Sequence, residues 1–202
     1  MSILPKFSFK NQAFKLRENA ILDVTTVVLS SKGYDLMTMD DVAGAVGISK
    51  PSLYKHFKSK EELVGEAMVR LLEGAIEEVD KLPAALNPVE KLQALLEWAM
   101  RVRLGGGLPF LPSTSPHVRD MLMRNFKYMT RVLKLNRLLE GMVKQAQKDG
   151  LLNAALPSDV ILYSYYARTC DPAVEYLQKF SKMSDDDIVR HMLKVSFEGF
   201  RN

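Results

Sequence analysis

The stretch Thr38–Phe57, which reads TMDDVAGAVGISKPSLYKHF, determines the fold of this chain because two short helix signals meet in it at a glycine. Thr38 is a good N-cap for a first helix that runs through Val46, and two aspartates in its first turn suit the helix dipole. Gly47 ends this helix, and Ser49 caps the next one, with a proline in its first turn. This arrangement predicts a helix-turn-helix.

The residues inside this stretch have the sizes that a helix-turn-helix requires. Ala43 is small, so the second helix can approach the first closely, and Gly47 tolerates the positive φ of the turn. Apolar side chains, among them Val46 and Leu53, hold the crossing angle. The second helix is then presented for insertion into a DNA major groove.

Helical periodicity continues on both sides of this stretch, and it predicts an all-α fold. In residues 12–32 the apolar side chains of Leu16, Ala20, Val24 and Val27 form one stripe, which Gly33 ends. A capping box over residues 59–62 opens a long helix that runs to about residue 81. Further helices are expected over residues 88–104 and 116–149, from residue 157 with an interruption at Asp171-Pro172, and over 184–200. No strand alternation and no repeat is visible.

The composition is that of an ordinary globular protein, and the sequence carries no known catalytic motif. The 202 residues are 47% hydrophobic, and no apolar run approaches the roughly 20 residues of a membrane span. The N-terminus lacks a signal-peptide pattern and there is one cysteine, Cys170, so we expect a reducing cytoplasm. HExxH, CxxC, P-loop and GxSxG motifs are absent, and we expect no catalysis, cofactor or metal.

The basic charge is concentrated in the first third of the chain. Residues 1–60 carry nine lysines and arginines against five acidic residues, which accounts for the net charge of +4 of the whole chain. Such a distribution is expected where one segment meets a polyanion, although a few exposed lysines produce the same balance by chance.

The sequence that follows Gly47, ISKPSLYKHFKSKEEL at residues 48–63, strongly resembles the DNA-binding domain of TetR-family transcriptional regulators. Those proteins share the pattern G-(I/V)-S-x-x-x-(L/I)-Y-x-(H/Y)-F-x-(S/N)-K-(E/D)-x-L, and the resemblance extends over residues 12–63. It implies a DNA-binding domain at residues 1–60 with an arm at 1–11, and a helical effector-binding and dimerisation domain at 61–202. It also implies a homodimeric repressor that is released from a palindromic operator by a small-molecule effector.

Within the resembling segment, side chains that suit phosphate or base contacts are the candidate DNA-binding residues. Tyr54 can donate to phosphate or be a half-buried core tyrosine, and His56 can contact phosphate or pack against the helix pair. Lys50 and Lys55 can donate to guanine or to phosphate, and Lys60 resembles the family's phosphate-binding lysine. The full set is Thr38, Ser49, Lys50, Pro51, Ser52, Tyr54, Lys55, His56 and Lys60. The arm Lys6–Lys10 suits a minor groove, a disordered tail or a cover for the first helix.

The resemblance also implies that the last two long helices dimerise. Val160, Tyr163, Ser164 and Ala167 share one face of the penultimate helix, and Ile188, Met192, Val195 and Gly199 share one of the last. Close four-helix packing around a two-fold axis and an intrachain core both account for this pattern.

An effector pocket requires apolar side chains with a few polar anchors, and several residues of the C-terminal region suit it. Plain core packing and surface exposure are the alternatives for the apolar and polar candidates respectively. The glycine-rich segment 105–112 is a candidate lid or a crossover, and Cys170 is a redox sensor or a buried thiol. The apolar candidates are Trp98, Met100, Phe126, Met129, Tyr163 and Tyr166, and the polar ones are Arg101, Arg103, His117 and Arg124.

The sequence therefore predicts a regulator in which each subunit inserts residues 50–56 into a major groove, with half-sites roughly 34–36 Å apart if one turn separates them. The alternative is a helical small-molecule binding protein whose DNA binding is degenerate or nonspecific.

Overall fold

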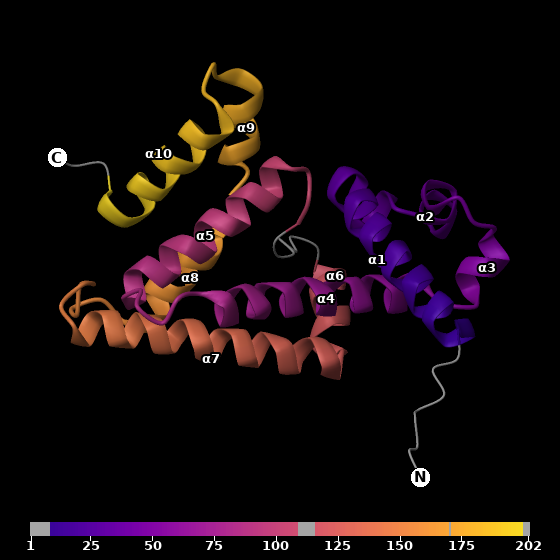
Figure 1. Ribbon diagram of the computed structural model, residues 1–202, viewed down its shortest axis with the longest axis horizontal. Helices are drawn as coiled ribbons and strands as arrows, with labels where there is room; N and C mark the ends of the chain where they lie inside the picture. The colour runs from indigo at the N-terminus through magenta and orange to yellow at the C-terminus, as the bar shows by residue number, and fades with distance from the viewer. Residues whose placement is uncertain (1–8, 109–115, 170, 200–202) are drawn as a thin grey trace, which may run out of the picture. The chain divides into compact units, whose positions relative to one another are not determined.

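The computed structural model describes residues 9–108, 116–169 and 171–199, and within these ranges it consists of helices and connecting segments without strands. The predicted all-α fold is confirmed (Figure 1). Nowhere in these ranges does a helix combine the length and apolar content needed to cross a membrane. The helices are α1 (Phe9–Leu36), α2 (Met39–Val46), α3 (Lys50–Tyr54), α4 (Lys60–Lys81), α5 (Pro88–Leu104), α6 (Pro116–Arg124), α7 (Phe126–Lys148), α8 (Ser158–Thr169), α9 (Ala173–Phe180) and α10 (Asp185–Glu198).

The chain divides into two compact units, of which the N-terminal unit ends at Ala67 and the C-terminal unit begins at Met68. This division falls inside α4, a few residues beyond the 60/61 boundary expected from the sequence. In the N-terminal unit α1 packs against α2, and α2 packs against α3 (Figure 1). Its core contains the fully buried side chains of Ile21, Val42 and Leu53.

Local capping makes the helix-turn-helix, as the sequence predicts. Thr38 Oγ1 accepts a hydrogen bond from the backbone N–H of Asp41 at 3.1 Å, and the carboxylate of Asp41 accepts one from the N–H of Thr38 at 2.9 Å. Gly47 adopts φ 78°, the left-handed conformation that favours glycine. Ser49 Oγ accepts from the N–H of Ser52 at 3.3 Å and opens α3.

The predicted apolar stripe of the first helix is wrong. Leu16 and Val27 are 69% and 60% exposed, and the buried face of α1 comprises Ile21, Thr25, Val28 and Leu29. Thr25 belongs to this face because its hydroxyl donates to the carbonyl of Ile21 at 2.7 Å, which satisfies the polar group inside the core. Gly33 interrupts α1 as the sequence predicts: its φ of 72° and ψ of 168° are non-helical and separate the long helix from a short helical segment that ends at Leu36.

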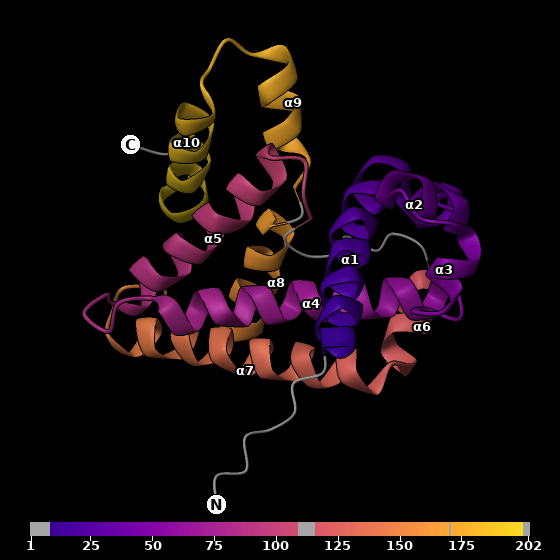
Figure 2. The same ribbon diagram turned by 45° about the vertical axis from the view of Figure 1, so that its right-hand side comes forward.

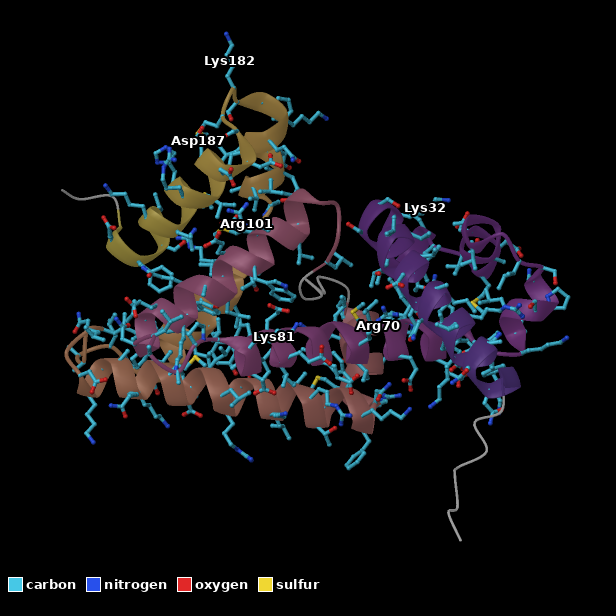
Figure 3. The ribbon with its side chains drawn as sticks, in the orientation of Figure 1. Lys32, Arg70, Lys81, Arg101, Lys182 and Asp187 are labelled. Carbon is cyan, nitrogen blue, oxygen red and sulfur yellow. The ribbon has the colours of Figure 1, made fainter. Side chains whose placement is uncertain are left out.

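In the C-terminal unit α5 packs against α7, α8, α9 and α10 (Figure 2). Leu95 and Leu96 of α5, Leu139 of α7 and Ile188 of α10 are at most 1% exposed and belong to one core. Figure 3 labels Arg101 on α5. Its guanidinium donates to the carboxylate of Asp186 at 2.8 Å and so links α5 to the start of α10.

One expectation for the C-terminal helices needs correction, and for the last helix the structure favours one of the two alternatives that the sequence left open. The region 116–149 is not one helix, because Asn125 separates α6 from α7 and accepts a hydrogen bond from the N–H of Tyr128 at 3.0 Å as an N-cap. The stripe of Ile188 and Met192 on α10 is intrachain core rather than a free face, since both side chains are buried. The predicted interruption at Asp171-Pro172 and the N-cap at Ser184 are confirmed.

Candidate functional site

The exposed edge of the helix-turn-helix is the first candidate site. On α3 the apolar side chain of Leu53 points into the core, whereas Lys50, Pro51 and Lys55 are exposed and Tyr54 is 42% exposed. The capping residues Thr38 and Ser49 are also exposed, and Ser52 is half-buried. One side of this short helix therefore holds the fold, and the other presents two ammonium groups and a phenol to solvent.

Carboxylates of α2 hold two of the lysines near this edge. Lys50 Nζ lies 2.8 Å from Asp40 Oδ2, and this carboxylate raises the pKa of Lys50. Lys32 Nζ lies 2.7 Å from Asp41 Oδ1, and this hydrogen bond, together with those from Thr38, lowers the pKa of Asp41 to about 2. The sequence contained no signal for the Asp40–Lys50 pair, because its partners are ten residues apart on different helices.

Lys60, at the start of α4, is half-buried against Tyr34. Its Nζ lies 4.3 Å from the centroid of the Tyr34 ring, a cation–π contact. The Tyr34 hydroxyl donates to Glu61 Oε1 at 3.4 Å, and burial together with the Glu61 charge raises the pKa of Tyr34. These contacts fix where the ammonium group of Lys60 lies beside the helix-turn-helix.

His56 does not belong to the exposed edge. Its side chain is 3% exposed, its ring stacks on Phe14 at a centroid distance of 4.0 Å, and Nδ1 lies 3.8 Å from Glu18 Oε1. The structure thus favours packing against α1 over the phosphate contact that the sequence left open. The arm Lys6–Lys10 lies outside the described side chains.

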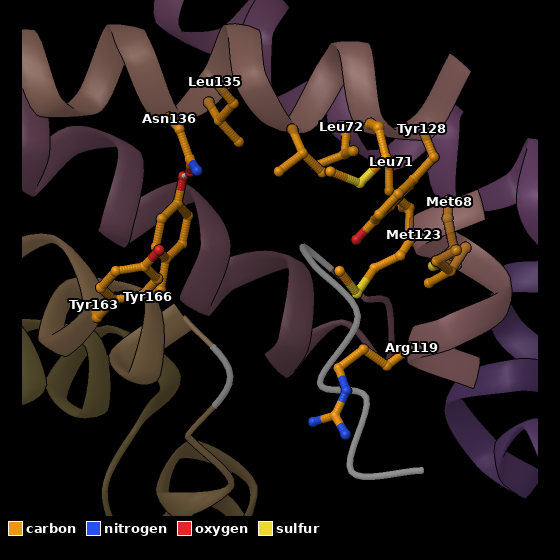
Figure 4. A pocket seen from close by; sticks show the side chains of 13 residues that line it. Met68, Leu71, Leu72, Arg119, Met123, Tyr128, Leu135, Asn136, Tyr163 and Tyr166 are labelled. Atoms are coloured by element: carbon orange, nitrogen blue, oxygen red, sulfur yellow. Dashed lines mark hydrogen bonds between the residues drawn. The ribbon is translucent and has the colours of Figure 1, made fainter. Parts of the chain in front are cut away.

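The second candidate site is a cavity of about 500 Å³ in the C-terminal unit, which falls in the range that holds drug-sized ligands. It is lined from four helices, α4, α6, α7 and α8. Polar groups of its wall come from Arg119, Tyr128, Asn136, Tyr163 and Tyr166 (Figure 4). Its apolar wall includes Met68, Leu71, Leu72, Leu122, Met123, Met129, Val132 and Leu135.

Half of the apolar residues predicted for the pocket line this cavity. Met129, Tyr163 and Tyr166 do so. Met100 instead is fully buried in the core and Trp98 packs against that core, while Phe126 is 81% exposed at the start of α7.

The predicted polar anchors lie elsewhere. Arg101 pairs with Glu97 and Asp186, and Arg103 is buried in an ion pair with Glu175 of α9. His117 and Arg124 are exposed on α6 and do not line the cavity. Among the described residues that line the cavity the cation is Arg119, which is not one of the polar residues predicted from the sequence. Residues 109–115 of the candidate lid, and Cys170, lie outside the described residues.

The hydrogen bonding of the cavity is concentrated between α7 and α8. The hydroxyl of Tyr166 donates to Asn136 Oδ1 at 2.5 Å, and burial raises the pKa of that tyrosine. The buried hydroxyl of Tyr165, outside the cavity wall, donates to the carbonyl of Leu92 at 3.0 Å and links α8 to α5. In the described ranges, no cluster of three or more His, Cys, Asp or Glu side chains is arranged to hold a metal ion.

Comparison with known proteins matches the helix-turn-helix to a family model. The model of bacterial regulatory proteins of the tetR family matches residues 21–67, which include the helix-turn-helix. The HTH-type transcriptional repressor KstR of Rhodococcus jostii (strain RHA1) is 28% identical over 139 residues, covering 69% of this chain. The match spans 63% of KstR, less than two-thirds of that relative's length.

Solved structures show the same fold over nearly the whole chain. KstR2 of Mycobacterium tuberculosis, a ketosteroid transcriptional regulator, superposes with a TM-score of 0.69 at 19% identity, covering 92% of this chain and 95% of KstR2. AibR, solved with isovaleryl coenzyme A and operator DNA, superposes with a TM-score of 0.65 at 22% identity, covering 91% of this chain and all of AibR.

Proposed function

The chain belongs to the TetR family of bacterial regulatory proteins, and on that premise we propose that it is a sequence-specific transcriptional repressor whose operator affinity falls when a small molecule fills the cavity. The observation that carries this proposal is the exposed edge of α3, where Lys50, Tyr54 and Lys55 project from a helix whose other side is core. This edge lies inside the segment that matches the family model.

In the proposed complex α3 enters the major groove of operator DNA. Tyr54, Lys60 and the capping residues Thr38 and Ser49 contact phosphates, which position the helix without reading sequence. The side chains of Lys50, Pro51, Ser52 and Lys55 are then nearest to the base edges. We leave His56 out of this set, because its side chain is buried against Phe14.

The proposed repressor acts in the cytoplasm as a homodimer. The face of α8 formed by Val160, Tyr163, Ser164 and Ala167 is exposed, and Val160 and Tyr163 are 52% and 65% exposed. Apolar side chains exposed together on one helix face suit burial against a second copy. A dimer with two-fold symmetry matches a palindromic operator with half-sites about 34–36 Å apart.

The proposed effector acts from the cavity. AibR has been solved with isovaleryl coenzyme A, and its fold is shared by this chain, so a molecule carrying an acyl group is a reasonable starting class. The effector lowers operator affinity only to the extent that it binds the DNA-free conformation of the dimer more tightly than the DNA-bound one.

Selection from a random pool of DNA duplexes by the purified full-length protein at physiological salt tests this function. We expect an enriched palindrome, bound about a thousandfold or more tighter than scrambled DNA. Comparable affinity for all duplexes would identify a nonspecific binder, and absence of DNA binding would leave a ligand-binding protein. Either result would contradict the proposal.

A lysine substitution then tests the orientation of α3. In Lys50→Ala the affinity for the selected operator falls, base preference next to that lysine relaxes, and the slope of log K against log salt decreases by about one. Lys144→Ala is the matched control, because Lys144 is an exposed, carboxylate-paired lysine on α7 of the C-terminal unit. Equal behaviour of the two variants would exclude the proposed docking.

A further inference from the structure

The polar groups of the cavity lie at separate places on its wall. Asn136 and Tyr166 meet on one side, whereas Arg119 projects from α6 on another (Figure 4). The wall elsewhere is made of leucine, valine and methionine side chains together with Tyr128 and Tyr163. An elongated apolar molecule with a polar group at each end matches this arrangement.

The guanidinium of Arg119 has no carboxylate partner among the described residues. By contrast, Arg101, Arg103 and Arg131 of the same unit each pair with a carboxylate. A guanidinium binds a carboxylate or phosphate through two parallel hydrogen bonds. This end of the cavity therefore suits an anion.

Asn136 has unused hydrogen-bond donors. Its Oδ1 accepts from the Tyr166 hydroxyl, which leaves the amide N–H groups of Nδ2 without a partner in the described residues. The side chain is half-buried in a largely apolar wall, so a ligand that fills the cavity removes this donor from water unless the ligand accepts a hydrogen bond from it. A ligand that places a carbonyl or hydroxyl oxygen there satisfies this donor.

We propose, building on the proposed function, that the effector is an apolar acid or its coenzyme A thioester with an oxygen function toward the other end of its skeleton. Arg119 binds the anionic head, the methionine and leucine side chains enclose the apolar body, and the amide of Asn136 donates to the second oxygen. The three residue sets thus select for charge, for apolar bulk and for a distal oxygen.

The charge requirement is tested by calorimetric titration of the full-length protein with dodecanoic acid, dodecanoyl coenzyme A and the uncharged dodecan-1-ol. We expect at least one anionic probe to bind about tenfold tighter than the alcohol, and Arg119→Gln to abolish that preference. Arg124→Gln is the matched control, since this arginine is exposed on the same helix but does not line the cavity.

The distal oxygen is tested with keto acids of increasing length, 9-oxodecanoic, 11-oxododecanoic and 13-oxotetradecanoic acid, each against its parent acid. We expect one length to bind about fivefold tighter than its parent, and Asn136→Leu to remove the gain but retain binding of the parent. Asn136→Ala serves as a second variant if the leucine variant unfolds, and a thermal melt of each variant reports that it is folded.

The source of the anion follows from which probe binds. Binding of the free acid alone identifies a carboxylate effector, and binding of the thioester alone identifies a coenzyme A effector. Either result supports the proposal if the Arg119→Gln variant loses that binding. Equal binding of acid, thioester and alcohol, or no binding of any probe, overturns it. Absence of a gain at every keto length overturns the role of Asn136. Because these titrations contain no DNA, their outcome is independent of whether an operator is selected.

Discussion

The two units of this chain hold their functional side chains in different ways. In the N-terminal unit the candidate DNA contacts lie within residues 38–60, and the caps that orient them join residues three apart, as between Thr38 and Asp41. In the C-terminal unit the cavity is assembled from four helices. The contacts that tie the helices of this unit together span long stretches, 73 residues between Tyr165 and Leu92 and 58 between Arg131 and Glu73.

This difference shows where function is encoded locally. Capping hydrogen bonds and a glycine with positive φ produce the reading helix from nearby residues, so a short sequence carries both its fold and its chemistry. The cavity depends on how distant helices pack, and no short sequence carries it. A substitution in one unit is therefore expected to affect that unit more than the other.

The largest expected effect comes from Leu53→Ala, which removes the fully buried side chain that fastens α3. The lost apolar burial and the resulting cavity destabilise the N-terminal unit by about 3 kcal/mol. Hydrogen exchange is expected to accelerate at the amides of α2 and α3 and to stay unchanged at those of α5 and α7, and operator affinity is lost.

Leu16→Ala is the control for this experiment, because its side chain is 69% exposed on α1. It is expected to change stability by no more than about 0.5 kcal/mol. If Leu53→Ala accelerated hydrogen exchange equally throughout both units, the two units would unfold together. That result would contradict the expectation that a substitution in one unit affects mainly that unit.

A smaller effect is expected in the C-terminal unit from Tyr165→Phe. The hydroxyl of this buried tyrosine donates to the Leu92 carbonyl, and its removal costs about 1 kcal/mol. Urea denaturation followed by hydrogen exchange in α5 and α8 measures this loss. Tyr176→Phe on α9 is the control, since that tyrosine is 63% exposed and lies on neither the cavity wall nor the proposed dimer face. Equal stability of the two variants would show that the long-range hydrogen bond contributes nothing.

The same contrast explains what the sequence predicted. The caps at Thr38, Ser49 and Ser184 and the break at Asp171-Pro172 are all present in the structure, because each depends on residues within a few positions. The break at Asn125 is also local, because asparagine is a favoured N-cap residue, but the apolar periodicity continues across it and by itself predicts one helix.

Burial was harder to predict than helix position. The buried face of α1 includes Thr25, whose hydroxyl bonds to its own helix, so a search for apolar spacing selected the exposed Leu16 and Val27 instead. Among the pocket candidates, Met100 and Met129 are alike in sequence terms, yet one is core and the other lines the cavity. Their difference arises from the packing of distant helices.

The smallest expected effect concerns the capping box of α2 and its dependence on pH. The hydrogen bond from Lys32, followed by those from Thr38, lowers the pKa of Asp41 from 3.8 to about 2. Because the folded state favours the ionised carboxylate, the unfolded state binds this proton more readily. The stabilisation is therefore fully present above about pH 4 and is lost as the pH falls toward about 2.

Asp41→Asn tests this local device, because asparagine keeps an acceptor for the N–H of Thr38 but loses the charge that pairs with Lys32. Thermal melts are expected to give a lower melting temperature for the variant than for the wild type at pH 7. This difference in melting temperature is expected to close between pH 4 and pH 2, as Asp41 of the wild type becomes protonated. Lys32→Ala, which removes the partner cation, is expected to lose less stability than the wild type between pH 4 and pH 2, because the pKa of its Asp41 lies closer to the unfolded value. A gap of constant size down to pH 2 would mean that the neutral hydrogen bonds of the cap, rather than the charge of Asp41, hold the start of α2.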